Sequence, residues 1–228
     1  MNSLCVICAR TGSTGLKNKN FLKINGKSLI KHTIDIALRS KIFKDIVVSI
    51  DKPNIKFNKY KSKIIVIERP KKLAQNNSKK IDAIRHAVKY CESKTNLNYE
   101  YIFDLDVTSP LRNYKDIQKS FKKFKKSKSD NLFSVTPSKK NPYFNMIEIK
   151  NKKVNLIKKG KKIISNRQKA PKTFDMNASI YIWKKKYLFK TYNLFSKKTS
   201  IYIMPAERSI DIDSSFDFKL VKHLLIRS

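Results

Sequence analysis

Two pairs of aspartates have a spacing that suits metal and phosphate chemistry. Asp104 and Asp106 are separated by one residue, and so are Asp211 and Asp213 near the end of the chain. On an extended backbone, side chains two positions apart point to the same face, so the carboxylates of each pair converge. Convergent carboxylates suit Mg²⁺, which takes one or two protein carboxylates together with phosphate oxygens. For the second pair, the alternative is a polar edge strand that ends at a helix cap formed by Asp213 or Ser214.

A glycine-containing loop offers a site for phosphate groups. The segment 9–20 follows a short apolar run and holds two of the four glycines of the chain, Gly12 and Gly15. Glycine lets the backbone bend sharply or approach a ligand closely. Backbone N–H groups in such a loop can bind phosphate oxygens, and Arg10 and Lys19 add positive charge. An ordinary turn between a strand and a helix, with solvated lysines, is the alternative.

Apolar runs and amphipathic segments alternate along the chain, which predicts an α/β protein. Their short connections indicate a mostly parallel sheet covered by helices on both faces. We expect strands at residues 3–9, 46–50, 64–67, 101–103, 132–135, 177–183 and 201–204, and helices at 28–41, 78–91, 114–128 and 215–225, with Ser28 and Ser78 as caps. Ligands bind beyond the carboxyl ends of parallel strands. The loop at 9–20, Arg69 and the first aspartate pair would therefore face one crevice.

The periodicity weakens between about residues 137 and 173. Within this segment, residues 146–149 and 153–156 predict a small hairpin, and lysines dominate the stretch after the hairpin. The segment is too short to form an independent hydrophobic core. We therefore expect one domain, residues 1–228, with an inserted arm at about 137–173 that packs on a second subunit.

The net charge of +35 would suit a protein that binds nucleic acid. However, 44 of the 52 basic residues are lysine and only 8 are arginine, and they are spread along the whole chain. Arginine is the residue favoured for specific contacts with bases and phosphates. The dispersed lysines are better explained by a compositional bias, and we expect no nucleic-acid partner. A lysine-rich nucleic-acid-binding protein is the alternative from another class of function.

Hydropathy and cysteine usage indicate a cytoplasmic protein without a membrane partner. No apolar run is long enough for a membrane span, and residues 4–8 already form the first strand, so no signal peptide is expected. Cys5 and Cys8 would point to opposite faces of that strand, which does not suit a zinc site. We expect buried free thiols in a reducing cytosol.

Five segments, in the same order, resemble the CMP-N-acylneuraminate synthetase (acylneuraminate cytidylyltransferase) family over nearly the full length. They are Ala9-Arg10-x-Gly-Ser-x-Gly-Leu-x-x-Lys19-Asn20, Arg69-Pro70 followed by Leu73-Ala74, Thr108-Ser109-Pro110-Leu111-Arg112, Asn177-Ala178-Ser179-Ile180-Tyr181-Ile182, and Ser209-Ile210-Asp211-Ile212-Asp213. Five ordered motifs are more specific than any single loop. The resemblance implies a Rossmann-like nucleotidyltransferase fold with a small dimerisation arm. It also implies a homodimer in which the partner's arm closes the sugar site.

The resemblance further implies a reaction in which CTP and a nonulosonic acid give a CMP-sugar and pyrophosphate. It implies catalytic roles for Arg10, Lys19 and Asp211, and a Mg²⁺ site, with Mn²⁺ as an alternative, at Asp211 and Asp213. The implied nucleotide-binding residues are Arg10, Gly12, Ser13, Gly15, Lys19, Asn20, Arg69 and Lys80. The implied sugar-binding residues are Asp106, Thr108, Ser109, Arg167, Gln168, Asn177 and Tyr181.

Several positions depart from the family pattern. Thr14 stands where a lysine is often found, and Lys80 stands where a serine is expected near the cytosine. Asp106 replaces the glutamine of neuraminate enzymes. An arginine that contacts the sugar in those enzymes aligns with Asp175, which leaves Arg167 as a partner for the sugar carboxylate.

Two segments bear on which sugar acid is used. Residues 141–146 and 170–178 look more like the bacterial legionaminate-type branch of the family. Sialic acid and legionaminic acid therefore both stand as substrates. The alternative enzyme is a CMP-Kdo synthetase, which shares the Arg-x-Gly-Ser-Thr opening. Lys19-Asn20 and the Ser-Ile-Asp-Ile-Asp segment argue against it.

Overall fold

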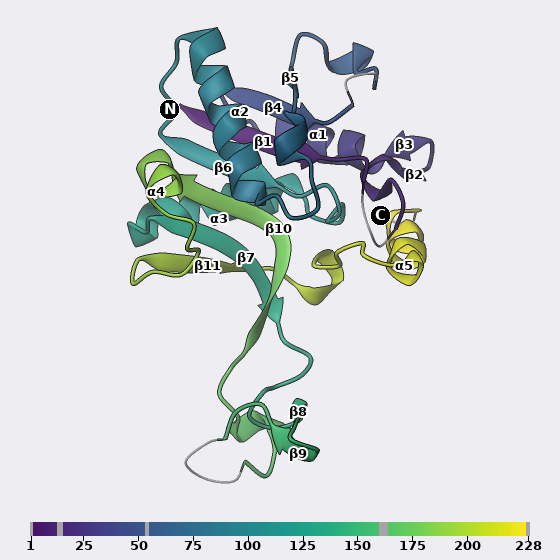
Figure 1. Cartoon of the computed structure of the whole chain (residues 1–228), viewed down its shortest axis with the longest axis vertical. Helices are drawn as coiled ribbons and strands as arrows, with labels where there is room; N and C mark the ends of the chain where they lie inside the picture. Colours follow the sequence, from purple (N-terminus) through teal and green to yellow (C-terminus); the bar gives the residue numbers. More distant parts are fainter. Residues whose placement is uncertain (1, 13–15, 53–54, 160–163, 227–228) are drawn as a thin grey trace.

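The body of the molecule is built on a seven-stranded sheet (Figure 1). A computed structural model describes residues 2–12, 16–52, 55–159 and 164–226. The strands lie in the order β11-β7-β10-β6-β1-β4-β5. Their bounds are β1 Ser3–Ala9, β4 Asp45–Ile50, β5 Ile65–Glu68, β6 Tyr101–Leu105, β7 Asn131–Pro137, β10 Phe174–Lys184 and β11 Thr199–Ile203. All neighbouring pairs are parallel except the two that involve β10, so the prediction of a mostly parallel sheet is confirmed.

Helices cover both faces of this sheet, as predicted. The helices α1 (Leu29–Ser40), α3 (Tyr114–Ser127) and α5 (Ser215–Ile226) contribute to one hydrophobic core. The helices α2 (Lys80–Thr95) and α4 (Lys185–Lys190) contribute to the other. Among the described residues, no helix is both long and apolar enough to span a bilayer.

The strand β1 shows why the sheet has two cores. Its side chains alternate between the faces, so Cys5 and Ile7 belong to the core under α1 and α3, whereas Val6 and Cys8 belong to the core under α2. All of these residues are buried. A strand buried on both faces reads as a continuous apolar run rather than an alternating one. The two cysteines lie on opposite faces, as their spacing predicts, and all three cysteines are free thiols.

Some helix starts differ from the sequence prediction. The helix α2 begins at Lys80, and the Ser78 hydroxyl donates a hydrogen bond to the Lys72 carbonyl instead of capping the helix. Ser28 does occupy the N-cap position of α1, although its side chain makes no capping hydrogen bond. At α5, Ser214 and Asp217 form a reciprocal pair in which each side chain accepts from the backbone N–H of the other.

The chain also contains short elements that the sequence did not predict. The helix α4 is one example, and the two-stranded ribbon of β2 (Lys23–Ile24) and β3 (Lys27–Ser28) is another. Five short 3₁₀ turns complete the described part of the chain: η1 Lys19–Phe21, η2 Asn58–Tyr60, η3 Lys71–Leu73, η4 Arg167–Lys169 and η5 Ala206–Arg208.

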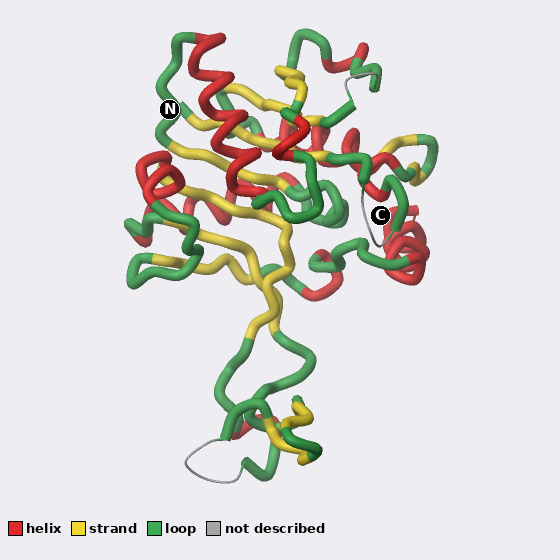
Figure 2. The backbone as a smooth tube through the Cα atoms, viewed as in Figure 1, coloured by secondary structure: helices red, strands yellow, loops and turns green. Residues whose placement is uncertain are grey.

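An arm projects from the body between β7 and β10. Figure 2 shows both strands leaving the sheet and leading to a distant hairpin of β8 (Ile147–Lys150) and β9 (Lys153–Leu156). In this hairpin, the register places four apolar side chains on one face, and all four are exposed: Ile147, Ile149, Val154 and Leu156. A two-stranded hairpin of this kind has no core of its own and is stable only when its apolar face is covered.

Arg112 fixes the point at which β10 bends away from the body. The register of β10 against β7 shifts between Met176 and Tyr181, and Ala178 adopts a left-handed φ of 50°. Arg112 is 1% exposed and donates hydrogen bonds to the carbonyls of Ser179 and Asp106 at 2.6 and 2.9 Å. One buried guanidinium therefore holds the bend of β10 against the end of β6.

Arg112→Met should lower the free energy of unfolding by about 3 kcal/mol or more, because each buried acceptor left without a donor costs about 1–3 kcal/mol. Urea unfolding followed by circular dichroism measures this loss. The control is Arg39→Met, since Arg39 is exposed and its guanidinium lies over the ring of Tyr114. A loss for Arg112→Met no larger than that of the control would contradict the role assigned to Arg112.

Candidate active site

A cleft of about 260 Å³ lies beyond the carboxyl ends of the parallel strands. It is lined by Cys8, Arg10, Lys19, Asn20, Arg69, Leu73, Gln75, Ser78, Lys80, Asp106, Thr108 and Asp211. These residues come from the end of β1, from the loops after β1, β5 and β6, from the start of α2 and from the segment before α5. A larger cavity of about 680 Å³ lies at the opposite end of β4 and β5, against Asp45 and Ile65, and holds none of the predicted site residues.

Polar contacts fix the two described ends of the loop after β1. Asp51, directly after β4, accepts hydrogen bonds from the backbone N–H and hydroxyl of Thr11 at 3.0 and 2.9 Å. Asn20 donates to the Arg10 carbonyl at 2.9 Å, and the Arg10 guanidinium donates to the Gln75 carbonyl at 3.0 Å. These bonds hold Asn20 next to Arg10, and both residues line the cleft.

The glycines and hydroxyls of this loop are only partly described. Ser13, Thr14 and Gly15 lie outside the described residues. At Gly12, a Cβ atom would meet nothing within 4 Å, so the space in the structure does not itself require glycine there.

Arg69 forms the wall of the cleft after β5. Its side chain is buried, and it donates to the hydroxyl and the carbonyl of Ser49 at 3.1 and 2.9 Å. Since Ser49 belongs to β4, the neighbouring strand fixes the guanidinium plane before any ligand arrives. A fixed arginine loses little conformational entropy when it binds.

Lys80 lies between the two aspartates at the end of β6. Its ammonium is 2.7 Å from one carboxylate oxygen of Asp104 and 2.7 Å from one of Asp106. Burial raises the pKa of Asp104 in spite of the lysine. At Asp106, burial acts in the same direction, but the charge of Lys80 and the hydrogen bonds from Lys80 and Thr108 together outweigh it and lower the pKa. Burial likewise opposes the charge of Lys80, yet the two carboxylates raise its pKa well above the ordinary value.

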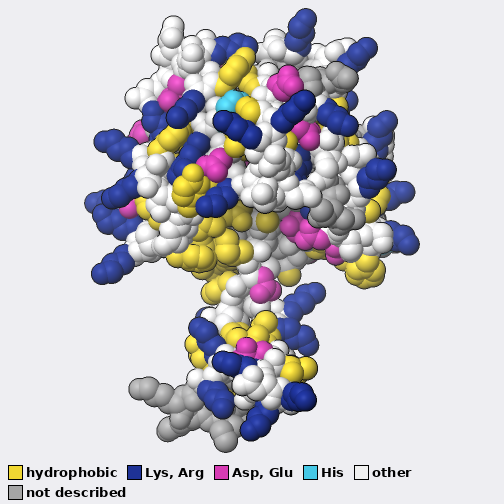
Figure 3. Space-filling model, viewed as in Figure 1, with side chains coloured by type: hydrophobic (Ala, Val, Ile, Leu, Met, Phe, Trp, Pro, Cys, Tyr) yellow, Lys and Arg dark blue, Asp and Glu magenta, His cyan; other side chains and the backbone are white. Residues whose placement is uncertain are grey.

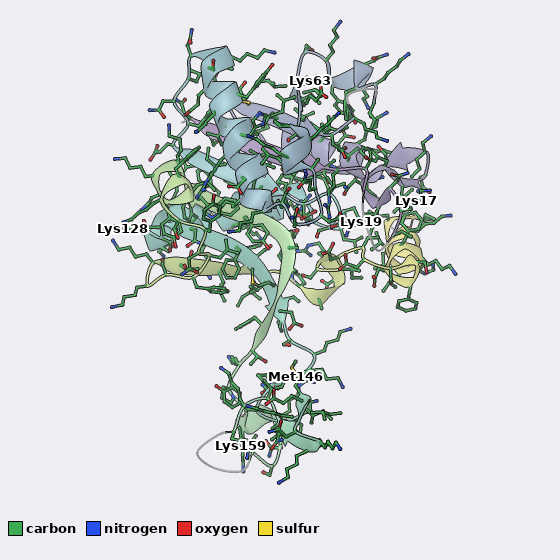
Figure 4. All side chains as sticks on the ribbon, in the orientation of Figure 1. Lys17, Lys19, Lys63, Lys128, Met146 and Lys159 are labelled. Carbon is green, nitrogen blue, oxygen red and sulfur yellow. The ribbon has the colours of Figure 1, made fainter. Side chains whose placement is uncertain are left out.

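Asp211 and Asp213 have different surroundings. One oxygen of Asp211 is buried without a hydrogen-bond partner in the described part of the chain, and burial raises the pKa of this carboxyl. The side chain of Asp213 is 72% exposed and accepts an ion pair from Lys19 at 2.7 Å. Figure 4 shows Lys19 beside α5. No group of three metal-binding side chains gathers among the described residues.

A cavity of about 510 Å³, which we call the aromatic cavity, adjoins the cleft. It is lined by Lys79, Lys80, Ile81, Ile84, Asp104, Asp106, Tyr181, Trp183, Tyr192 and Leu194. The rings of Tyr181 and Trp183 are stacked, with centroids 5.6 Å apart and an angle of 7° between their planes. Lys80 and Asp106 line both cavities, so their ion pair forms the shared wall.

The structure separates the predicted sugar-binding residues into three groups. Asp106, Thr108 and Tyr181 line the cleft or the aromatic cavity. Ser109 and Asn177 are buried behind them, as the Ser109 hydroxyl donates to the Asn177 carbonyl at 3.3 Å.

Arg167 and Gln168 form the third group, and they lie in the arm. They line a separate cavity of about 480 Å³ near the base of the arm, and the Arg167 guanidinium donates to the Ser138 carbonyl at 3.1 Å. Figure 4 marks the arm with Met146 and Lys159, and both are far from Lys19 and the cleft. Within one chain, the arm residues do not join the site.

The sequence prediction missed several residues of this region. Asp51 could have been found, because it directly follows a predicted strand and the residues after parallel strands gather at one edge of the sheet. Trp183 and Tyr192 gave no such signal. The Tyr192 hydroxyl donates to Asp82 at 2.8 Å across 110 positions of sequence, and no local pattern indicates that contact.

The burial of Cys8 in the cleft can be tested without a ligand, through the reactivity of its thiol. Burial raises the pKa of its thiol to about 11, so at pH 8 only about one molecule in a thousand carries the reactive thiolate. We expect the native protein to react with iodoacetamide far more slowly than the unfolded protein, with a rate that rises about ten-fold per pH unit. Mass spectrometry of the labelled chain measures this rate. Labelling of native Cys8 at the rate of an exposed cysteine would contradict this burial.

Comparison with solved structures agrees with this architecture. The structure of CMP:2-keto-3-deoxy-manno-octonic acid synthetase in complex with CTP aligns with a TM-score of 0.71 at 14% identity, covering 100% of this chain and 99% of that chain. The structure of 4-diphosphocytidyl-2C-methyl-D-erythritol synthase from Anaerococcus prevotii aligns with a TM-score of 0.61 at 14% identity and covers 99% of each chain. At these identities the likeness concerns the fold alone.

Sequence comparison reaches further. The chain is 41% identical over 224 residues to the post-translational flagellin modification protein B of Campylobacter coli, covering 97% of this chain and 94% of that protein. Identity and coverage are the same for the CMP-N,N'-diacetyllegionaminic acid synthase of Campylobacter jejuni. An N-acylneuraminate cytidylyltransferase of Streptococcus agalactiae is 31% identical over 98% of this chain and 54% of its own length. The cytidylyltransferase family model matches residues 4–224. The protein therefore belongs to the cytidylyltransferase family, and it is a nucleotidyltransferase.

Proposed function

We propose that this protein transfers CMP from CTP to a nonulosonic acid of the legionaminic type and releases pyrophosphate. The observation that carries the proposal is the 41% identity, over 97% of the chain, to a relative named for the synthesis of CMP-N,N'-diacetyllegionaminic acid. The arrangement of the cleft supports it, because cations, carboxylates and an adjoining cavity are what a transfer between a nucleotide and a sugar acid requires.

The nucleotide would occupy the cleft. Arg10 and Lys19 provide positive charge for the triphosphate, while Arg69 and Asn20 are oriented by their own hydrogen bonds to contact the nucleoside. The anomeric hydroxyl of the sugar acid attacks the α-phosphorus, and pyrophosphate leaves. No covalent enzyme nucleophile is needed, so the chain acts by holding the two reactants in line and by stabilising charge on the phosphate oxygens.

Asp211 and Asp213 would hold Mg²⁺, with Mn²⁺ as an alternative. The buried oxygen of Asp211 that has no hydrogen-bond partner among the described residues fits this role, because such an atom is stabilised when a cation binds it. Asp213 is exposed and is bound by Lys19, which is placed to reach the same phosphates. The metal would neutralise charge on the triphosphate and on the leaving pyrophosphate.

The sugar acid would occupy the aromatic cavity. Tyr181, Trp183 and Leu194 offer apolar surface for the carbon skeleton and its substituents, and the shared wall brings this cavity next to the cleft. A reactant held there would meet the α-phosphate near Lys80 and Asp106. Burial of an apolar substituent against these rings adds binding energy in proportion to the area covered.

A homodimer is part of the proposal. The exposed apolar face of the hairpin and the half-exposed Phe174, Met176 and Ile203 at the base of the arm leave more apolar surface than an isolated chain would favour. Figure 3 shows apolar side chains gathered where the arm leaves the body. A second copy would cover these surfaces, and its arm would bring Arg167 and Gln168 to the sugar site of the first. A cytoplasmic location is consistent with the three free thiols.

The reaction is tested by measuring pyrophosphate release from CTP and Mg²⁺ with a panel of legionaminic, neuraminic, pseudaminic and Kdo acids. We expect the highest kcat/KM with diacetyllegionaminic acid. Turnover of Kdo alone would favour the alternative enzyme. No turnover with any acid, together with tight and salt-sensitive binding to DNA or RNA, would overturn the proposal.

Asp211→Asn should lower kcat by about a hundred-fold or more, because it removes a carboxylate charge where the metal and the phosphates meet. Glu207→Gln is the matched control, since this substitution removes the same charge from an exposed site outside the cleft. An Asp211→Asn variant with the turnover of the control would remove Asp211 from the metal site.

Ile149→Asp should convert the dimer to a folded monomer, because it places a charge on the apolar face of the hairpin. Light scattering coupled to size exclusion gives the mass. Asn155→Asp is the control, since Asn155 pairs with Glu148 on the other face of the hairpin. A parent protein that is monomeric, or an Ile149→Asp variant that stays dimeric, would contradict this part of the proposal.

A further inference from the structure

Lys80 occupies an unusual position between two cavities. It is the first residue of α2, and its side chain reaches across the end of β6 to bind Asp104 and Asp106, each at 2.7 Å. Asp104 is fully buried, and Lys80 is the cation that contacts it among the described residues. Asp106 is less dependent on the lysine, because it also accepts from the Thr108 hydroxyl at 3.1 Å.

Among the described residues, the ammonium of Lys80 contacts two acceptors, which leaves one donor for a ligand. An ammonium carries three N–H donors, and the two aspartates take two of them. The side chain remains 38% exposed, and it lines both the cleft and the aromatic cavity. The third donor therefore faces space that a substrate can enter.

The positions of the other cations suggest that the third N–H donor of Lys80 serves a ligand in the aromatic cavity rather than one in the cleft. The cleft already contains Arg10, Lys19 and Arg69 for the nucleotide. In the aromatic cavity, the other cation is Lys79, whose ammonium lies 4.4 Å from the centre of the Tyr192 ring. Among the described cations that line the aromatic cavity, Lys80 is thus the one that lies over no aromatic ring and is held in place by carboxylates.

The charge of the cluster indicates which kind of group it binds. One ammonium and two carboxylates do not carry the net positive charge that a further carboxylate would require. A neutral group suits them better. Lys80 offers a donor and Asp106 an acceptor side by side, and an amide presents the matching acceptor and donor. The apolar walls at Ile84 and Leu194 would take the alkyl part of an acyl group.

We propose that Lys80 determines specificity for the acid substrate by donating its third proton to the carbonyl oxygen of an acylamino substituent, with Asp104 as its buried counter-charge. This inference rests on the proposed function. It assigns Lys80 to binding of the acid substrate, whereas the family resemblance implied that Lys80 binds the nucleotide.

The direct variant, Lys80→Met, would leave two carboxylates without their cation and could unfold the chain. The test therefore uses Asp104→Asn as the parent and adds Lys80→Met to it. Asn replaces the carboxylate that depends on Lys80, while Asp106 keeps its hydrogen bonds to Thr108. Lys89→Met in the same parent removes an equal charge from the exposed side of α2.

We expect the added Lys80→Met to raise KM for diacetyllegionaminic acid about ten-fold or more, which is the loss of one hydrogen bond to a buried group. KM for CTP should change less than about two-fold, and Lys89→Met should change neither constant. The inhibition constant of an acylamino acid, divided by that of its hydroxyl analogue, should rise about ten-fold as well.

Three results would overturn the inference. The first is a rise in KM for CTP without a rise in KM for the acid. The second is an equal rise in the inhibition constants of the acylamino and hydroxyl acids. The third is no change in any of these constants. CTP binding in the absence of acid, measured by calorimetry, separates this failure from a failure of the proposed function. An unsubstituted protein that binds CTP but turns over no acid contradicts the function, whereas an Asp104→Asn/Lys80→Met variant that turns over both acids with the selectivity of the Asp104→Asn parent contradicts only the role of Lys80.

Discussion

The charge of Asp104, at the centre of the sheet, constrains much of the molecule. Its strand β6 lies between β1 and β10, and its side chain is only 1% exposed. A carboxylate in such a place is strongly unfavourable without a counter-charge. Lys80 supplies that charge, and it can do so only because α2 begins directly over the end of β6. The start of α2 in turn sets the wall between the cleft and the aromatic cavity.

A second buried charge organises the other side of β6. Arg112 binds the carbonyls of Asp106 and Ser179 and so ties β6 to β10 where β10 changes register. The strand β10 therefore serves two regions. Its inner half places Tyr181 in the aromatic cavity, and its outer half leads into the arm. A change in the bend at Ala178 would alter the site and the arm together.

The lysines that give the chain its high net charge are of two kinds. Lys19 and Lys80 are paired with aspartates at the cleft, and their positions are fixed by those pairs. Basic side chains elsewhere are spread over the visible surface, as Figure 3 shows, without a concentrated stripe. Surface lysines of this kind contribute little to stability and are screened by salt. The chemistry of the site depends on the few charges that the fold brings together.

Local sequence patterns are enough to predict the alternation of strands and helices, the mostly parallel sheet and the residues that gather at its carboxyl edge. These follow from local periodicity and from the rule that ligands bind beyond parallel strands. Three features emerge only in the folded chain: β10 runs antiparallel, Asn177 is buried behind the cleft, and Lys80 binds two aspartates more than twenty positions away. Such contacts depend on which elements become neighbours, and no pattern within a short window of sequence records that choice.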